Sequence, residues 1–390
     1  MRATRTHAAS TPHERGFTLV ELMVGLVLGL LTVLVITQVL AAAEGKKRTV
    51  SMGADAQVNG ALALYTLQRE VQAAGYGAAT SPAALGCTIK GKYTNGSVMP
   101  ATSADVSMTL APIVITNGTN GAPDQITVLQ SQTAQFSAPI RITETHDASL
   151  GYFVVQSSLG VAVGDLMVAV PTTPSATDTC TIFAATAVAQ TPTRILHGAD
   201  GSTGWNSAIP WPESPAKYEG AVVTEKLAKS YLLNLGTLTQ RTYSVSAAHD
   251  LQVTATTSKS VNSAAADLYP QIVNLQAMYG KDTDADGMVD RWDTTTPTTQ
   301  ADWVKVLAIR VAVVARSNQY EKDVVTTAGN SPQWDIGASD ATDATTAACP
   351  GSNSGNKCIA LKIDNVTDWG HYRYKVYDAV IPLRNMLWNS

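Results

Sequence analysis

Charged and aromatic residues are scarce in this chain. Of its 390 residues, 15 % are charged and 6 % are aromatic, whereas 45 % are hydrophobic. The formal net charge is −4 at pH 7, and no basic stripe follows any segment, which argues against nucleic-acid binding. This composition, with its many Ala, Thr, Ser and Val residues, favours a β-rich exported head over a charged cytoplasmic enzyme.

Catalytic motifs are also lacking. The sequence contains no Gly-x-Ser-x-Gly, no His-Glu-x-x-His, no phosphate-binding loop and no glycine-rich nucleotide fingerprint. Two of the six histidines lie within residues 1–16. We expect the others to be surface residues rather than bases or metal ligands: His146, His197, His249 and His371. The sequence therefore predicts a non-catalytic protein.

One long hydrophobic run is present near the N-terminus. Residues 17–43 contain a single charged residue, Glu21, and such a run can span a bilayer. A secretory signal peptide is cut after its apolar segment. Here the predicted cut, between Gly16 and Phe17, lies before that segment and after a polar leader of residues 1–16. Cleavage would therefore leave the hydrophobic helix on the mature protein.

This arrangement resembles the type IV prepilin signal, in which a glutamate occupies the fifth mature position, as Glu21 does here. The resemblance implies that a prepilin peptidase cleaves after Gly16 and N-methylates Phe17. It also implies that Glu21 pairs with the freed amine of Phe17 in a neighbouring subunit during assembly. The alternative is a simple membrane anchor. However, a carboxylate inside such a segment costs about 2.5–3.5 kcal/mol on insertion scales and usually has a partner.

The helix is predicted to continue well past the apolar run. No proline occurs from Phe17 to Ala74, and apolar residues keep helical spacing while polar residues enter the pattern. We therefore expect a transmembrane and assembly half over residues 17–43 and an amphipathic half over residues 44–77. Gly75 and Gly77 are expected to end the helix, as glycine commonly does.

Residues 78–390 are predicted to form one large head outside the cytoplasm. Its variable region, residues 80–270, contains short strand-like runs separated by turn signals, such as residues 125–129 and 166–170. A short helix is expected over residues 264–278. A C-terminal sheet is expected over residues 305–390.

The four cysteines all lie in this predicted exported part. An even number of cysteines in an oxidising compartment indicates two disulfides. Cys349 and Cys358 flank a flexible loop and are expected to pair, which leaves Cys87 to pair with Cys180. A zinc site would need Cys-x2–4-Cys spacings, and neither pair has one.

Three segments resemble the PilW-type minor pilins of type IV pili. They are the Ala-Gly-Tyr-Gly turn within residues 67–77, the arginine-flanked run 306–317, and the C-terminal segment 372–385. The resemblance implies an α+β fold, in which a long N-terminal pilin helix packs on an antiparallel β-rich globular head with a large β-rich insertion. It further implies a minor pilin of the inner-membrane and tip complex that initiates pilus assembly in a Gram-negative bacterium.

The partners implied by this resemblance are other minor pilins, the major pilin, the prepilin peptidase, the inner-membrane assembly platform and a large tip adhesin. Two other functions stay open at this point. One is a minor pseudopilin of type II secretion, similar to GspJ. The other is a calcium-dependent pilus-tip adhesin, whose middle region would bind a surface directly.

Residues 282–293 carry regularly spaced aspartates. Compared with the twelve-residue calcium loop, they place oxygen donors at the first, third, fifth, ninth and twelfth positions and a glycine at the sixth. The predicted ligands are Asp282, Asp284, Asp286, the carbonyl of Met288, Asp290 and Asp293. We expect a structural calcium ion that holds residues 279–305 rigid. The alternatives are a solvated acidic turn and magnesium, which demands stricter octahedral geometry.

Overall fold

The computed structural model describes residues 16–78, 81–95, 102–132, 138–146, 149–172, 179–198, 204–206, 218–220, 230–337, 340–341, 347–349 and 356–387. The chain divides into two compact units, residues 1–54 and 55–390. Most of the predicted leader, residues 1–15, lies outside the described residues.

The N-terminal part of the chain forms a single 54-residue helix, α1 (Leu19–Gln72). The prediction of one helix that ends at the paired glycines is confirmed, since Gly75 and Gly77 have φ values of 79° and 83°. These left-handed conformations suit glycine and stop the helix. The stretch Leu19–Gly45 is long and apolar enough to cross a membrane, and its side chains are exposed in the structure.

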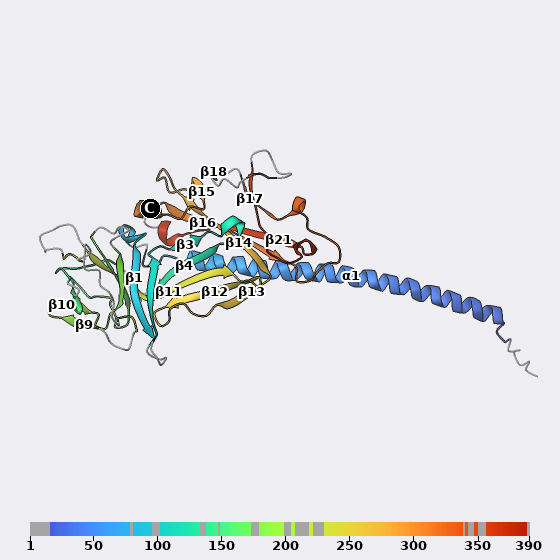
Figure 1. Cartoon of the computed structure of the whole chain (residues 1–390), viewed down its shortest axis with the longest axis horizontal. Coiled ribbons are helices and arrows are strands. Elements are labelled where there is room, and N and C mark those ends of the chain that lie inside the picture. Colours follow the sequence, from blue (N-terminus) through green and yellow to red (C-terminus); the bar gives the residue numbers. More distant parts are fainter. Residues whose placement is uncertain are drawn as a thin grey trace, which may run out of the picture. The chain divides into compact units, whose positions relative to one another are not determined.

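The second unit buries one face of α1 in its main core. Ala63, Leu67 and Val71 have no exposed surface, and they belong to a cluster with Leu275 and Ile309 from the surrounding strands. Figure 1 shows this part of the helix running among β3, β4, β14 and β16. The amphipathic half therefore docks onto a sheet, as its periodicity predicts.

Most strands of the variable region join one twisted sheet. Within the described residues its strand order is β13-β12-β11-β7-β8-β1-β2, with β3, β4 and β5 paired off this path. The bounds are β1 (Thr88–Asn95), β2 (Thr102–Thr109), β3 (Ile113–Thr116), β4 (Gln125–Gln132), β5 (Ile140–Arg141), β7 (Leu166–Val170), β8 (Cys180–Ala184), β11 (Tyr231–Val245), β12 (Asp250–Thr257) and β13 (Ala266–Pro270). The expected strands at residues 125–129 and 166–170 are present.

A second sheet has the order β18-β15-β14-β16-β21 in the described part of the chain. Its strands are β14 (Ile272–Lys281), β15 (Arg291–Asp293), β16 (Val306–Arg316), β18 (Asp340–Ala341) and β21 (Tyr374–Pro382). Two three-stranded sheets contain β6 (Tyr152–Val154), β9 (Ala187–Gln190) and β10 (Thr193–Leu196), and β17 (Gln333–Gly337), β19 (Ala347–Ala348) and β20 (Lys357–Ala360). Short helices are α2 (Gln300–Val304), α3 (Arg384–Leu387), η1 (Pro82–Ala84), η2 (Thr119–Gly121), η3 (Ala328–Asn330) and η4 (Trp369–His371).

The helix expected over residues 264–278 is wrong, because the structure has strands β13 and β14 there. Strand β14 is buried on both faces. Leu275 and Ala277 join the core that contains α1, whereas Val273 and Met278 join the core beneath β17 and β20. A run that is apolar on both faces carries no clear two-residue period, so its pattern does not distinguish a strand from a buried helix.

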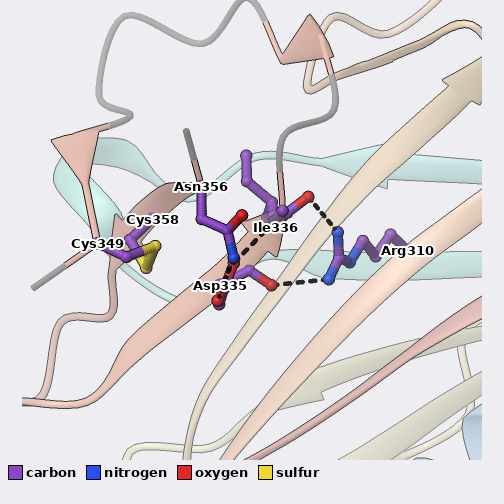
Figure 2. Close-up of a disulfide and its surroundings, with 7 residues drawn as sticks. Arg310, Asp335, Ile336, Cys349, Asn356 and Cys358 are labelled. Carbon is purple, nitrogen blue, oxygen red and sulfur yellow. Dashed lines mark hydrogen bonds between the residues drawn. A yellow bond between two sulfur atoms is a disulfide. The ribbon is translucent and has the colours of Figure 1, made fainter. Parts of the chain in front are cut away.

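Both predicted disulfides are present. Cys87–Cys180 joins the start of β1 to β8, which run parallel at this point. Cys349–Cys358 joins the end of β19 to β20, which contains Cys358. Figure 2 shows that Arg310 of β16 donates to the carbonyl oxygens of Asp335 (2.7 Å) and Ile336 (2.8 Å), which attaches the disulfide-bearing sheet to the five-stranded sheet.

Candidate functional site

The N-terminal motif forms a capping box at the start of α1. The backbone N–H and the hydroxyl of Thr18 each donate to Glu21 Oε2 at 3.0 Å, and the Glu21 N–H donates to Thr18 Oγ1 at 3.2 Å. This reciprocal arrangement satisfies amides that the first helical turn would otherwise leave unpaired. Gly16 and Phe17 are exposed just before the cap. The structure thus places the three predicted residues together at the helix start.

The predicted calcium segment is the tip of a β-hairpin. Strands β14 and β15 pair antiparallel, with Lys281 opposite Arg291, so the connection runs from residue 282 to residue 290. Carboxylate oxygens of Asp282, Asp284 and Asp290 lie within 4.8 Å of one another. Three of the predicted ligands therefore face one point at the hairpin tip.

Backbone amides hold this tip in shape. Asp282 accepts from the N–H groups of Ala285 (2.6 Å) and Gly287 (2.8 Å), and Asp290 accepts from the N–H of Thr283 (2.7 Å). Gly287 has a φ of 84°, which supports the glycine predicted at the sixth position of the loop. The loop shape thus depends on its own carboxylates as well as on any ion.

The carboxylates of the tip also affect one another electrostatically. Partial desolvation, with the negative charges of Asp286 and Asp290, raises the pKa of Asp284. Hydrogen bonds from the N–H and hydroxyl of Thr283 lower the pKa of Asp290. A cation between these groups would relieve the repulsion that raises the pKa of Asp284.

Asp293 lies apart from the three grouped carboxylates. It accepts a hydrogen bond from the Lys281 ammonium at 2.7 Å and another from the Thr295 N–H at 2.9 Å, and its side chain is 10 % exposed. The cause is the strand that follows the loop. A helix would turn the twelfth position back towards the ion, whereas a strand rises about 3.3 Å per residue and carries it away.

The remaining predicted ligands, Asp286 and Met288, are both exposed at the tip. Asp286 Oδ1 accepts from the Met288 N–H at 2.8 Å, which leaves its second oxygen available. Calcium takes six to eight oxygen ligands and tolerates irregular geometry. The three grouped carboxylates fit that donor chemistry, and the group contains no sulfur or imidazole donor of the kind that zinc prefers.

Two of the histidines that the sequence predicts at the surface are buried. His146 and His197 are 4 % and 5 % exposed, and their Nε2 atoms lie 3.0 Å apart. Phe153 stacks on His146 at 4.0 Å between ring centroids. Burial, together with the charge of His146, lowers the pKa of His197 to about 3. Isolated histidines carry no periodic signal, so this pair cannot be inferred from the sequence pattern.

Two family models match the chain. Residues 11–37 match the prokaryotic N-terminal methylation motif, which includes the capped helix start. Residues 237–385 match the type IV pilus-assembly protein W family, from β11 to α3, and this range includes the acidic hairpin. These two matches support a PilW-type, prepilin-like minor pilin. No curated protein and no solved structure matches it significantly.

The first match lies in the N-terminal unit and the second in the head unit. The methylation motif and the apolar helix indicate membrane anchoring and association with a type IV pilus. The PilW-type match covers the sheet on which the amphipathic half of α1 packs. A match to a pilus-assembly family implies interaction with other pilus components, and pilin families are structural rather than enzymatic.

Proposed function

We propose that this PilW-type minor pilin belongs to the complex that initiates assembly at the tip of a Gram-negative type IV pilus. In this proposal the prepilin peptidase cuts between Gly16 and Phe17, and α1 holds the protein in the inner membrane with its head in the periplasm. Other minor pilins, the major pilin, the assembly platform and a tip adhesin are the proposed partners. The observation that carries the proposal is a methylation motif with a capped glutamate ahead of a PilW-type head.

The geometry of Glu21 supports an assembly role. Both hydrogen bonds that it accepts from Thr18 reach the same oxygen, Oε2. The second oxygen, Oε1, can therefore accept the Phe17 amine of a neighbouring subunit without opening the cap. Because a carboxylate inside a bilayer is costly when unpaired, that contact would favour the assembled state.

Complementation of a strain that lacks the gene tests this role. Glu21→Ala should fail to restore surface pili, whereas Glu44→Ala, which removes an exposed carboxylate from the same helix, should restore them. Membrane levels of both variants must match the wild type. A normally piliated deletion strain, or full rescue by Glu21→Ala, would contradict the proposal.

We further propose that the hairpin tip binds a structural calcium ion. Asp282, Asp284 and Asp290 would provide the core of its ligand set, with Asp286 and the Met288 carbonyl close by. The ion would supply positive charge where three carboxylates converge and would hold the tip against local opening. Chelation should then raise protease cleavage and hydrogen exchange within residues 282–290. Unchanged exchange after chelation would contradict a structural ion.

A further inference from the structure

A broad groove opens in the head on the opposite side of β14 from the α1 core. Its volume is about 810 Å³, within the range of small-molecule sites. Its floor contains buried apolar side chains of β14 and of the segment around β20, including Met278, Ile359 and Leu361. One wall is the loop that contains η2, and the other is formed by β17 and η4. The groove is thus built from both core sheets.

Each charged side chain that lines this groove already has a partner. Lys362 lies 3.7 Å from the carboxylate of Asp364. Asp124 is buried, and its two oxygens accept the N–H groups of Gly118 and Ala277, each at 2.8 Å. A phosphate or a nucleotide would therefore find no unpaired cation among the described lining residues, and a metal ion would find no carboxylate without a partner.

The polar groups that remain are neutral amides and hydroxyls. Asn120 and Gln333 are exposed at the rim, and within the described residues their side-chain amides make no hydrogen bond. Gln276 uses only its NH₂ group, towards Ala122 and Asn274. Such groups can donate a hydrogen bond to a hydroxyl group and can also accept one from it. The half-buried indole of Trp369 adds a flat apolar surface beside them.

The backbone of the groove floor offers little to an extended peptide. On β14, the Leu275 carbonyl accepts from the Asp124 N–H at 2.7 Å, and the Ala277 N–H donates to the Asp124 carboxylate. The groups that would form a ladder with an added strand are therefore occupied. A ligand here would be bound by side chains rather than by strand addition.

We propose that this groove binds a neutral saccharide. Sugars combine apolar C–H faces with rims of hydroxyls, which match the indole and aliphatic floor and the amide rim. The volume is ample for a di- or trisaccharide. The proposal is independent of the pilus assembly role and of the calcium ion, since the lining includes none of the predicted calcium ligands.

Saturation-transfer NMR on the full chain in lipid nanodiscs tests the proposal. Chitobiose and lactose are the neutral probes, sialyllactose is the charged probe, and acetylated tetra-alanine amide is the peptide probe. We expect transfer to a neutral sugar at probe concentrations up to about 10 mM, since weak sites of this kind bind in the millimolar range. Nanodiscs avoid the sugar headgroups of common detergents.

Two rim variants and one matched control assign the signal to the groove. Asn120 has a φ of 53°, so Asn120→Gly removes its amide without straining the backbone. Combined with Gln333→Ala, it should weaken binding by about 5- to 50-fold, as expected for two lost hydrogen bonds. Gln125→Ala, at the exposed start of β4 and outside the groove, should leave binding unchanged.

Four results would overturn the proposal. They are no transfer to either neutral sugar, transfer only to sialyllactose, transfer only to the peptide, and undiminished sugar binding in the folded double variant. Thermal melts of all variants, compared with the wild type, establish that each one is folded.

Discussion

Two aspartates in the same hairpin should respond in opposite ways to the same substitution. Asp290 is one of the three grouped carboxylates at the tip, whereas Asp293 pairs with Lys281 at the base. Changing either to asparagine keeps its shape and removes one negative charge. The comparison therefore separates a proposed cation ligand from a structural ion pair.

The magnitudes follow from burial. The side chains of Lys281 and Asp293 are 15 % and 10 % exposed, so Asp293→Asn leaves a largely desolvated ammonium without its carboxylate. We expect a loss of about 2–3 kcal/mol in the free energy of unfolding, with or without calcium. Asp290 is exposed, and an asparagine there can still accept from the Thr283 N–H. Without calcium, Asp290→Asn should therefore leave the free energy of unfolding nearly unchanged.

Calcium affinity should show the reverse order. Asp290→Asn removes one of three converging charges and should weaken calcium binding about tenfold or more, because ligand charge tunes such sites. At saturating calcium, a tenfold weaker site lowers the stabilisation by about 1.4 kcal/mol. Asp293→Asn should change the affinity little, since its carboxylate lies outside the group.

The assay combines calorimetric calcium titration with denaturant unfolding of the full chain in nanodiscs, in excess calcium and in chelator. Loss of calcium binding in Asp293→Asn, with normal binding in Asp290→Asn, would refute the division of roles within the hairpin. No calcium-dependent heat in the wild-type protein would instead refute the calcium proposal itself. The two failures are therefore distinguishable.

Three further predictions concern stability. Gly60→Ala would place a Cβ against the ring of Tyr377 and should destabilise the head by about 1–3 kcal/mol. Gly45→Ala is the control and should not destabilise it, because no neighbouring atom lies within 4 Å of the added Cβ. Chemical denaturation compares the two variants. Removing the Cys87–Cys180 disulfide, whose cysteines are 93 residues apart, should lower the free energy of unfolding by about 4–5 kcal/mol. Removing the Cys349–Cys358 disulfide, whose cysteines are 9 residues apart, should lower it by about 2–3 kcal/mol. Denaturant unfolding of the two paired Cys→Ser variants tests this order. His197 keeps a pKa of about 3 when folded but takes up a proton below about pH 6.5 when unfolded. Stability should therefore fall as the pH drops from 6.5 towards 3, by at most about 1.4 kcal/mol per pH unit, and His197→Gln should flatten this slope in thermal melts.

Several features of this chain follow from the sequence alone. The continuous α1 follows from a proline-free pattern with helical spacing that ends at Gly75 and Gly77. The disulfide pairs follow from the even number of cysteines beyond the apolar run and from one short loop. The strand β16 follows from its β-branched run. The helix and strand signals are local, since neighbouring residues decide the backbone conformation. Among four cysteines, pairing the two that flank the short loop leaves a single choice for the other two.

Tertiary structure alone decided the remaining features. β14 is a strand because α1 covers one of its faces and the sheet of β17 and β20 covers the other, a pairing that no short window of sequence contains. The loop spacing predicts that Asp293 lies beside the other aspartates. In the structure Asp293 belongs to β15, which pairs with β14, and its carboxylate contacts the Lys281 ammonium instead. The buried pair of His146 and His197 and the amide-lined groove likewise join segments far apart in the chain. Long-range packing places those side chains, and it depends on the whole fold rather than on local preference.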